Sequence, residues 1–382
     1  LTPHCSPLTS MRPILSVSHL TTRFQTDRGI VTAIDDVSFD LYPGETLGIV
    51  GESGCGKTVT SKSIMRLLPE RTSRIDPQSR IILRPAVAAK PGGRTQTIPE
   101  IDLAHANERT LRKVRGDRVA MIFQEPMTSL NPVFTIGWQI DEALQFHTEL
   151  DRQARRARAL EMLKLVEIPD AARRIDQYPH ELSGGMRQRV MIAIALCCEP
   201  DILIADEPTT ALDVTIQAQI LELMEGLKKR LSTAIILITH NLGVVAQVCD
   251  RVMVMYAGRV IETGGVRDIF HHPRHPYTRA LLDSIPRTGR KEHARRLPTI
   301  EGIVPSLYDL PRGCRFAERC PFKQERCVEI EPGLAPAPPA ASDVPTSDGV
   351  PGASRLVRCH FPLADAAPGA EVRAPQPGGI GA

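Results

Sequence analysis

The sequence is short of aromatic side chains and has no long apolar run. Phe, Trp and Tyr make up only 4% of its 382 residues, so few side chains are available to stack on a nucleobase. No stretch approaches the roughly 20 apolar residues that a membrane-spanning helix needs, so any contact with a membrane is expected to be made through partners. The N-terminal residues lack a cationic stretch followed by an apolar core, and a secretory signal is therefore not expected.

The chain also lacks a strong excess of charge of either sign. Lys and Arg total 47 against 44 Asp and Glu, a net charge of +3, which is too small to favour nucleic acid as a partner. With 42% hydrophobic residues, the chain is long enough for a substantial core and two or three domains. Residues 1–13, which include those before Met11, are expected to form a disordered leader.

A phosphate-binding loop follows an apolar run that predicts a buried strand. Residues 51–58 read GESGCGKT, a complete GxxxxGK[ST] pattern. In such a loop the glycines let backbone N–H groups turn toward the phosphates, and the following helix directs the positive end of its dipole there. Lys57 would contact the β- and γ-phosphates, and the Thr58 hydroxyl would hold Mg²⁺. The residues expected to bind nucleotide here are Gly51, Ser53, Gly54, Cys55, Gly56, Lys57, Thr58 and Val59.

A second apolar run ends in two acids. Residues 202–205 read ILIA and lead to Asp206 and Glu207, as expected of a parallel strand that delivers carboxylates to the carboxyl edge of a sheet. Asp206 is suited to hold Mg²⁺, and Glu207 is placed to polarise an attacking water.

A serine and two glycines mark an apparent helix start upstream of these acids. Residues 182–188 read LSGGMRQ and precede an apolar segment. The hydroxyl of Ser183 and the bare amides of Gly184 and Gly185, at the positive end of a helix, predict a second surface for phosphate. A single γ-phosphate does not need two separate binding surfaces in one chain. The number of nucleotides and subunits per complete site is therefore in question.

Six motifs in one order resemble the nucleotide-binding subunit of an ATP-binding cassette (ABC) transporter. The resemblance spans about residues 14–268, and a set of six motifs is far more specific than any one of them. In chain order they are GESGCGKT, Gln124 within IFQE, LSGGMRQ, ILIADE, ALD at 211–213 and His240 within ITH.

This resemblance implies cofactors and roles for the site residues. It implies ATP with Mg²⁺, and a head-to-tail dimer in which Ser183 of one subunit caps the ATP bound to the phosphate loop of the other. Gln124 is implied to contact Mg²⁺ and to sense the membrane partner. Glu207 is implied to be the catalytic carboxylate, His240 to grip the γ-phosphate, and Asp213 to couple the two sites.

The resemblance also implies the fold class and the domains. The fold is expected to be α/β: a P-loop NTPase (ABC ATPase) core with an antiparallel β-subdomain and an α-helical subdomain, plus a small irregular cysteine-containing C-terminal extension. The nucleotide-binding domain is expected at 14–270, with the helical subdomain at about 136–186, the extension at 271–365 and a disordered tail at 366–382. The basic tract 84–94 is interpreted as a solvated loop.

Local patterns predict several individual elements. Thr58 to Leu68 has helical spacing and stops at Pro69. Strands are predicted by alternation or by apolar runs at 37–41, 81–83, 234–239 and 252–256.

An aromatic side chain that stacks on adenine should lie upstream of the phosphate loop, at Phe24 or Phe39. Phe39 belongs to an alternating stretch whose period of two predicts a half-buried strand with this ring in the core. Phe24 precedes the turn-like residues 26–29 and is free to stand beside a base. Phe24 is therefore favoured, with a core or surface role as the alternative.

Four cysteines stand in a segment dense in Pro and Gly: Cys314, Cys320, Cys327 and Cys359. In a chain without an export signal, such thiols are more readily metal or cluster ligands than disulfides. The absence of CxxC pairs argues against a zinc ribbon, whereas iron–sulfur clusters take four thiolates at more varied spacings. An iron–sulfur cluster, zinc and reduced structural cysteines are the alternatives for these four residues. By contrast, Cys197, Cys198 and Cys249 lie in apolar runs and are expected in the core.

Further segments resemble the ATPase subunits of dipeptide and oligopeptide importers. They are PMTSLNP at 126–132, YTRALL at 277–282, and the sequences around the cysteines at 313–321 and 358–360. The resemblance implies an ATP hydrolase that powers peptide import by ATP-driven dimerisation of two nucleotide-binding domains. It also implies a 4Fe-4S cluster on Cys314, Cys320, Cys327 and Cys359. The alternatives are an ATPase of an importer for nickel or another small solute, and a soluble ABC ATPase without a membrane partner.

The same resemblance implies the partners and the location. A second, related but non-identical ATPase subunit and two transmembrane permease subunits are expected, with an extracytoplasmic substrate-binding protein as an indirect partner. The chain would lie at the cytoplasmic face of the cell (inner) membrane, held there peripherally by the permease subunits.

Overall fold

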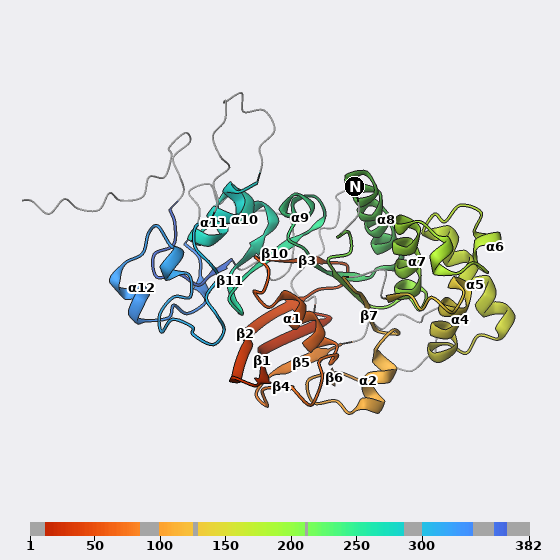
Figure 1. The fold of residues 1–382 in the computed structure, drawn as a ribbon, viewed down its shortest axis with the longest axis horizontal. Coiled ribbons are helices and arrows are strands. Elements are labelled where there is room, and N and C mark those ends of the chain that lie inside the picture. The colour runs from red at the N-terminus through yellow and green to blue at the C-terminus, as the bar shows by residue number, and fades with distance from the viewer. Residues whose placement is uncertain are drawn as a thin grey trace, which may run out of the picture.

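Two β-sheets organise the chain (Figure 1). The structure, a computed structural model, describes residues 12–84, 99–124, 129–210, 213–285, 300–338 and 355–364. Most of the tract 84–94, the tail 366–382 and the PMT of PMTSLNP lie outside the described residues.

The larger sheet has eight strands in the order β12-β13-β11-β10-β3-β9-β8-β7. Its five parallel strands are β3 (Thr46–Val50), β7 (Val119–Ile122), β8 (Ile202–Asp206), β9 (Ala234–Ile238) and β10 (Arg251–Tyr256). Every residue of β3, β8, β9 and β10 is buried, which explains why these strands read as continuous apolar runs. Their carboxyl ends share one edge, where ligands bind in open α/β sheets.

Helices connect these strands and cover the sheet. They are α1 (Lys57–Ile64), α7 (Gly184–Leu196), α8 (Val214–Leu231) and α9 (Leu242–Val248). The predicted helix at 58–68 is shorter than expected. It ends at Ile64, because the chain turns at Arg66, whose φ of 52° is left-handed.

The smaller sheet is antiparallel and lies beside α1 (Figure 1). Its strands run in the order β2-β1-β5-β6, with β4 paired to β1. They are β1 (Leu15–Thr26), β2 (Gly29–Leu41), β4 (Ser73–Ile75), β5 (Arg80–Leu83) and β6 (Ile101–Asp102), followed by α2 (Glu108–Val114). Leu15 and Ile34 share one buried cluster with Ile49 of β3, so the two sheets pack on a common core.

A group of helices lies at the right-hand end of the molecule in Figure 1. It comprises α4 (Ile136–His147), α5 (Arg152–Leu165), α6 (Ala171–Arg174) and the short η1 (Pro179–Glu181), which leads into α7. Thr135 and Asp151 cap α4 and α5 through their side chains. This group falls within the predicted helical subdomain at about 136–186.

The C-terminal extension continues the central sheet. After β11 (Arg259–Gly265), the chain forms α10 (Val266–His271), α11 (Pro276–Asp283), η2 (Ala317–Arg319), α12 (Glu325–Glu329), β12 (Ala335–Pro336) and β13 (Leu356–Val357). Val357 and Leu356 pair with Glu262 and Thr263 of β11. The sequence did not predict that the extension would supply the edge strands of the core sheet.

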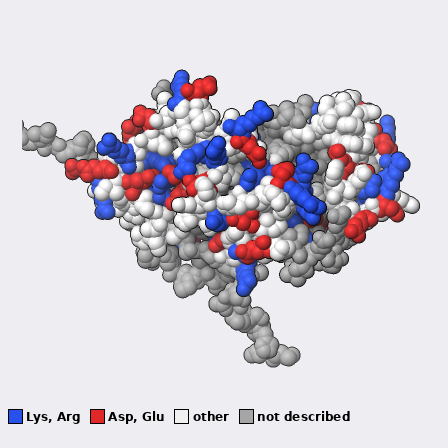
Figure 2. Space-filling view, turned by 90° about the horizontal axis from the view of Figure 1, so that it is seen from below, with Lys and Arg blue, Asp and Glu red and all other residues white. Residues whose placement is uncertain are grey.

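Within the described residues, no helix is both long and apolar enough to cross a membrane. On the face seen in Figure 2, Lys and Arg side chains are interleaved with Asp and Glu. This mixed surface matches the nearly balanced composition.

Candidate active site

The phosphate loop joins β3 to α1. Its first residue, Gly51, has a φ of +151°, and a Cβ there would lie 2.3 Å from the carbonyl oxygen of Met255, so only glycine fits. At the other end, Gly56 caps α1 in a left-handed conformation without a side-chain hydrogen bond. The open N-terminal amides of α1 suit an anion.

Lys57 is buried and folded over the loop. Its Nζ donates to the carbonyl oxygens of Gly51 at 2.8 Å and of Glu52 at 3.0 Å. A lysine held by weak neutral acceptors is able to exchange them for phosphate oxygens, which are charged and bind more strongly. Of the predicted loop residues, Ser53 and Gly54 are exposed, whereas Cys55 is fully buried and Val59 packs partly against the core.

Thr58 meets Asp206 across the sheet edge. The Thr58 hydroxyl donates to Oδ1 of Asp206 at 3.2 Å. Burial raises the pKa of Asp206, and the Thr58 hydrogen bond opposes that rise. A hydroxyl and a carboxylate beside a phosphate loop are oxygen donors of the kind that Mg²⁺ prefers.

Glu207 is the centre of a polar cluster at the ends of three neighbouring strands. Its Oε2 accepts from Nε2 of Gln124 at 3.1 Å and from the Thr210 hydroxyl at 2.9 Å. Its Oε1 lies 3.3 Å from Nδ1 of His240. Glu207 also has a φ of 50°, a strained conformation for a non-glycine residue of the kind that gathers at functional sites.

The surroundings keep the Glu207 carboxylate ionised. Burial raises its pKa, but hydrogen bonds from Thr210 and His240 outweigh burial and hold the pKa below its ordinary value. At neutral pH, an ionised carboxylate in this position is able to accept a proton from water.

The predicted second phosphate surface lies at the start of α7. Ser183 is the N-cap of this helix, and its hydroxyl accepts from the backbone N–H of Met186 at 3.4 Å. Ser183 and Gly184 are exposed, and Gly185 is half-buried beside Ile216. Asp213 caps α8 in the same manner and is also exposed.

Two polar residues beside the Glu207 loop were not predicted from the sequence. Thr210 follows Glu207 by three positions and supplies one of its hydrogen bonds. Gln188, the last residue of LSGGMRQ, is buried and donates to the carbonyl oxygen of Pro208. Both lie inside or next to motifs already recognised. Their polar side chains at those positions could have indicated a role near the site.

Phe24 is half-buried on β1 and lines a hollow of about 870 Å³ together with Ser63 and Arg66. Residues 51–58 are all described, and none of them lines this hollow. A stacking role for Phe24 stays a prediction. Phe39 packs partly buried against the core of the antiparallel sheet, in agreement with its predicted place.

The four cysteines of the extension line one small hollow of about 20 Å³, formed by segments around 314–327 and 359–361 together with His275. Burial raises the pKa of Cys314, that of Cys320 to about 11 and that of Cys359 to about 12. Among the residues that the structure describes, no group of three or more His, Cys, Asp or Glu is arranged to hold a metal ion. The expected core cysteines, Cys197, Cys198 and Cys249, are buried in the core.

Comparison with known proteins places the chain in a family. The family model described as ABC transporter matches residues 34–210. A solved dimer of the ATP-binding cassette MJ0796, in a post-hydrolysis state bound to ADP and Pi, is 27% identical with a TM-score of 0.56 and covers 66% of this chain and 99% of that one. The cassette cbiO1 from Clostridium perfringens is also 27% identical, with a TM-score of 0.53, over 68% of this chain and 91% of that one. The fold is that of an ABC ATPase, an ATP-hydrolysing enzyme, and the predicted α/β cassette core is confirmed.

The relatives narrow this class. The family model described as oligopeptide/dipeptide transporter, C-terminal region, matches residues 261–327. The probable peptide ABC transporter ATP-binding protein y4tR of Sinorhizobium fredii is 53% identical over 328 residues, which are 85% of this chain and 92% of that one. The dipeptide transport ATP-binding protein DppD of Bacillus subtilis is 51% identical over 323 residues, 85% of this chain and 91% of that one. The chain belongs to the ATP-binding proteins of ABC transporters, in the group with this C-terminal region, as the motifs predicted.

Proposed function

We propose that this chain is the ATP-hydrolysing subunit of an importer of dipeptides or oligopeptides. The observation that carries the ATPase is the ionised Glu207 held by Gln124, Thr210 and His240 beside the phosphate loop. The peptide substrate is supported by the relatives, two of which are described as peptide and dipeptide transport proteins and match over 85% of this chain.

Each residue of the site has a proposed task. The loop amides and Lys57 bind the phosphates of ATP, and Lys57 gives up its carbonyl partners to do so. Thr58 and Asp206 would hold Mg²⁺, and the ion when bound would neutralise charge on the phosphates. Glu207 accepts the proton of the attacking water, and Gln124 and His240 orient Glu207 toward it.

The exposed start of α7 is proposed to serve a second subunit. Ser183, Gly184 and Gly185 would cap the ATP bound to a partner cassette, so each chain contributes two half-sites. The partner is proposed to be a related, non-identical ATPase, and both would attach to two permease subunits at the cytoplasmic face of the membrane. An extracytoplasmic substrate-binding protein would deliver the peptide.

Two variants test the phosphate loop. Lys57→Ala should weaken the binding of MgATP by the purified chain, because it removes the only cationic side chain among residues 51–58. Lys113→Ala, which changes an exposed lysine on α2, is the matched control. Unchanged affinity in Lys57→Ala would remove ATP binding from this loop.

The substrate and the dimer need the assembled transporter. Co-purification with two membrane subunits is expected, and peptide with its binding protein should stimulate ATP hydrolysis. Stimulation by nickel alone would assign another substrate, and a chain that never associates with membrane subunits would be a soluble ATPase. Ser183→Arg should remove hydrolysis at the one site that Ser183 caps, and so lower hydrolysis by the assembly, while the isolated chain still binds ATP. Full hydrolysis by the assembly would exclude the shared site.

The thiol-lined hollow is proposed as the site of a 4Fe-4S cluster on Cys314, Cys320, Cys327 and Cys359. Its support is that these four thiols, from two separated segments, line one hollow, and that cysteine thiolates are the ligands that such clusters use. Anaerobically purified protein should be brown and contain iron, and Cys320→Ser should lose both. Colourless, iron-free but folded protein would rule out the cluster.

A further inference from the structure

An ion pair joins the C-terminal extension to the phosphate loop. Glu52 is the second residue of the loop, and its two carboxylate oxygens accept from the two terminal nitrogens of Arg319 at 2.6 and 3.0 Å. The Arg319 side chain is only 6% exposed, against 26% for Glu52. A bidentate pair between arginine and a carboxylate fixes orientation as well as supplying energy.

Arg319 is itself restrained before it pairs. Its Nε donates to the carbonyl oxygen of Glu301 at 2.9 Å. Its guanidinium lies 5.8 Å from the ring centroid of Tyr256 and 6.0 Å from that of Phe316. Because these contacts already hold the side chain, it loses little conformational freedom on binding Glu52.

The backbone of the same loop residue is held by a second group of the extension. The N–H of Glu52 donates to the Tyr277 hydroxyl at 2.9 Å. Tyr277 is fully buried on α11, with its ring 5.4 Å from that of Phe316. Glu52 is thus fixed through both its side chain and its main chain.

Another arginine braces the loop through a hairpin turn. Arg315 donates to Asp35 of β2 and to the carbonyl oxygen of Ala257, in the turn between β10 and β11. The next residue, Gly258, donates its N–H to the carbonyl oxygen of Cys55 in the phosphate loop at 3.0 Å. Contacts from the extension therefore reach the loop at two points.

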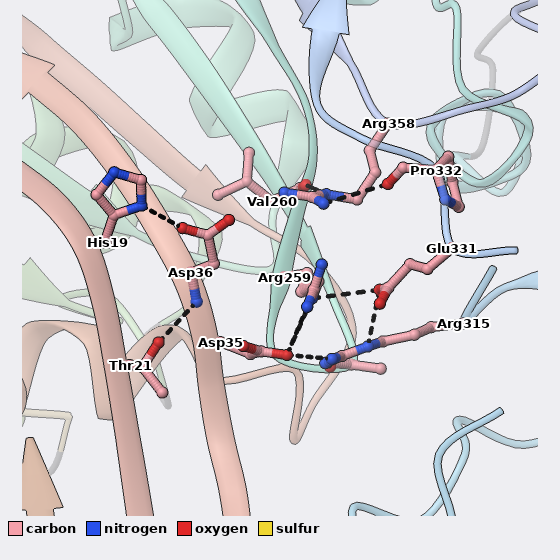
Figure 3. A network of polar contacts seen from close by, with 11 residues as sticks. His19, Thr21, Asp35, Asp36, Arg259, Val260, Arg315, Glu331, Pro332 and Arg358 are labelled. Atoms are coloured by element: carbon pink, nitrogen blue, oxygen red, sulfur yellow. Dashed lines mark hydrogen bonds and ion pairs between the residues drawn. The ribbon is translucent and has the colours of Figure 1, made fainter. Parts of the chain in front are cut away.

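The brace at Arg315 is part of a shared network (Figure 3). Arg259 of β11 and Arg315 of the extension both pair with Asp35 and with Glu331. Two arginines between two carboxylates balance charge and bridge three segments, which favours one fixed arrangement over separate surface pairs.

We propose that Arg319 is a positioning residue for the phosphate loop, so that the C-terminal extension is a working part of the ATP site. The proposal rests on the proposed binding of ATP by this loop. A cradle of amides binds phosphate well only if it keeps its shape before the ligand arrives. Loss of Arg319 therefore costs ATP affinity, whereas the Glu207 cluster, and with it the rate at saturating ATP, stays intact.

The test separates affinity from turnover in the full-length chain. Arg319→Gln should raise the Kd for MgATP, and the KM of the assembled transporter, about 10-fold, as expected for loss of a charged bidentate contact. The value of kcat should stay within about twofold, because the group that activates water is unchanged. Arg319→Lys keeps the positive charge but loses the planar guanidinium that makes the bidentate contact. It should therefore lose less affinity for MgATP than Arg319→Gln. Arg312→Gln, an exposed arginine of the same segment, should change nothing.

A second series guards against a folding defect. Glu52→Gln removes the partner from the loop side and should raise the Kd to a similar degree. The double variant Arg319→Gln/Glu52→Gln should bind ATP no more weakly than either single variant, because each single change already removes the same ion pair. Additive losses, or a Kd for Arg319→Gln equal to that of the wild type, would overturn the proposal. If Lys57→Ala loses ATP binding while Arg319→Gln does not, only this inference fails; if Lys57→Ala binds normally, the proposed function fails.

Discussion

Gln188 of α7 donates a hydrogen bond to the main-chain carbonyl of Pro208, the residue that follows Glu207. Gln188 is 1% exposed, so this contact lies between the helix that begins at Ser183 and the loop that carries the proposed catalytic carboxylate. Gln188 therefore links α7 directly to the loop that carries Glu207.

Replacement of Gln188 should remove the hydrogen bond between α7 and the loop that carries Glu207. Gln188→Ala leaves the Pro208 carbonyl without its buried partner, which should lower the free energy of unfolding by about 1–3 kcal/mol. It should also reduce kcat of the assembled transporter more than it raises the Kd for ATP. Urea unfolding and steady-state kinetics measure the two effects, with Gln219→Ala, an exposed glutamine of α8, as the control. A loss of stability without a change in kcat would limit Gln188 to a structural role.

Glu207→Gln should separate binding from hydrolysis. The amide keeps the shape of the side chain and still accepts from Thr210, but it does not take a proton from water. Affinity for ATP should persist while kcat falls by about 10²–10⁴-fold, the usual contribution of a general base. Nucleotide binding and phosphate release test this, and Glu222→Gln on the exposed side of α8 should be neutral. Robust hydrolysis by Glu207→Gln would show that another residue is the general base.

Gly51→Ala should lower the free energy of unfolding more than the same substitution at Gly44, another glycine with a positive φ. A methyl group at Gly51 meets the Met255 carbonyl oxygen at 2.3 Å and Cys55 Sγ at 2.8 Å, so the backbone must shift at a cost of about 2–4 kcal/mol. Gly44 also has a positive φ but nothing within 4 Å, and Gly44→Ala should cost about 1 kcal/mol. Thermal unfolding compares the two, and equal losses would contradict the steric argument.

His275 should make the fold sensitive to mild acid. It is 2% exposed, caps α11 through the N–H of Tyr277, and burial lowers its pKa to about 3. The folded chain keeps this ring neutral while the unfolded chain takes up a proton below about pH 6.5. The contribution of the neutral His275 to the free energy of unfolding is therefore fully present above pH 6.5. It falls as the pH drops toward 3, by about 1.4 kcal/mol for each pH unit.

Urea unfolding at pH 7.5 and pH 5.5 measures this contribution. His275→Asn retains an N-cap acceptor and has no proton to gain. The loss between the two pH values should be smaller in the variant by about 1.4 kcal/mol. An identical loss in both proteins would show that His275 takes up its proton over the same pH range in the folded and the unfolded chain.

Much of the fold could be read from local patterns. The apolar runs at 202–205, 234–239 and 252–256 became buried parallel strands within one residue of their expected bounds. Ser183 became a helix cap, and GESGCGKT became the loop between a strand and a helix. These features depend on burial and torsion preferences within a few neighbouring residues, which a sequence states directly.

The sequence by itself determined which residues belong to the phosphate loop and which strands deliver acids to the sheet edge. Only the tertiary structure decided that Glu207 meets Gln124 from 83 residues away and that Glu52 meets Arg319 from 267 residues away. The order of strands in a sheet is set by how all the buried faces pack together, so no local pattern specifies it. For the same reason, the extension became the edge of the core sheet and a neighbour of the phosphate loop, although its own sequence is irregular and rich in proline.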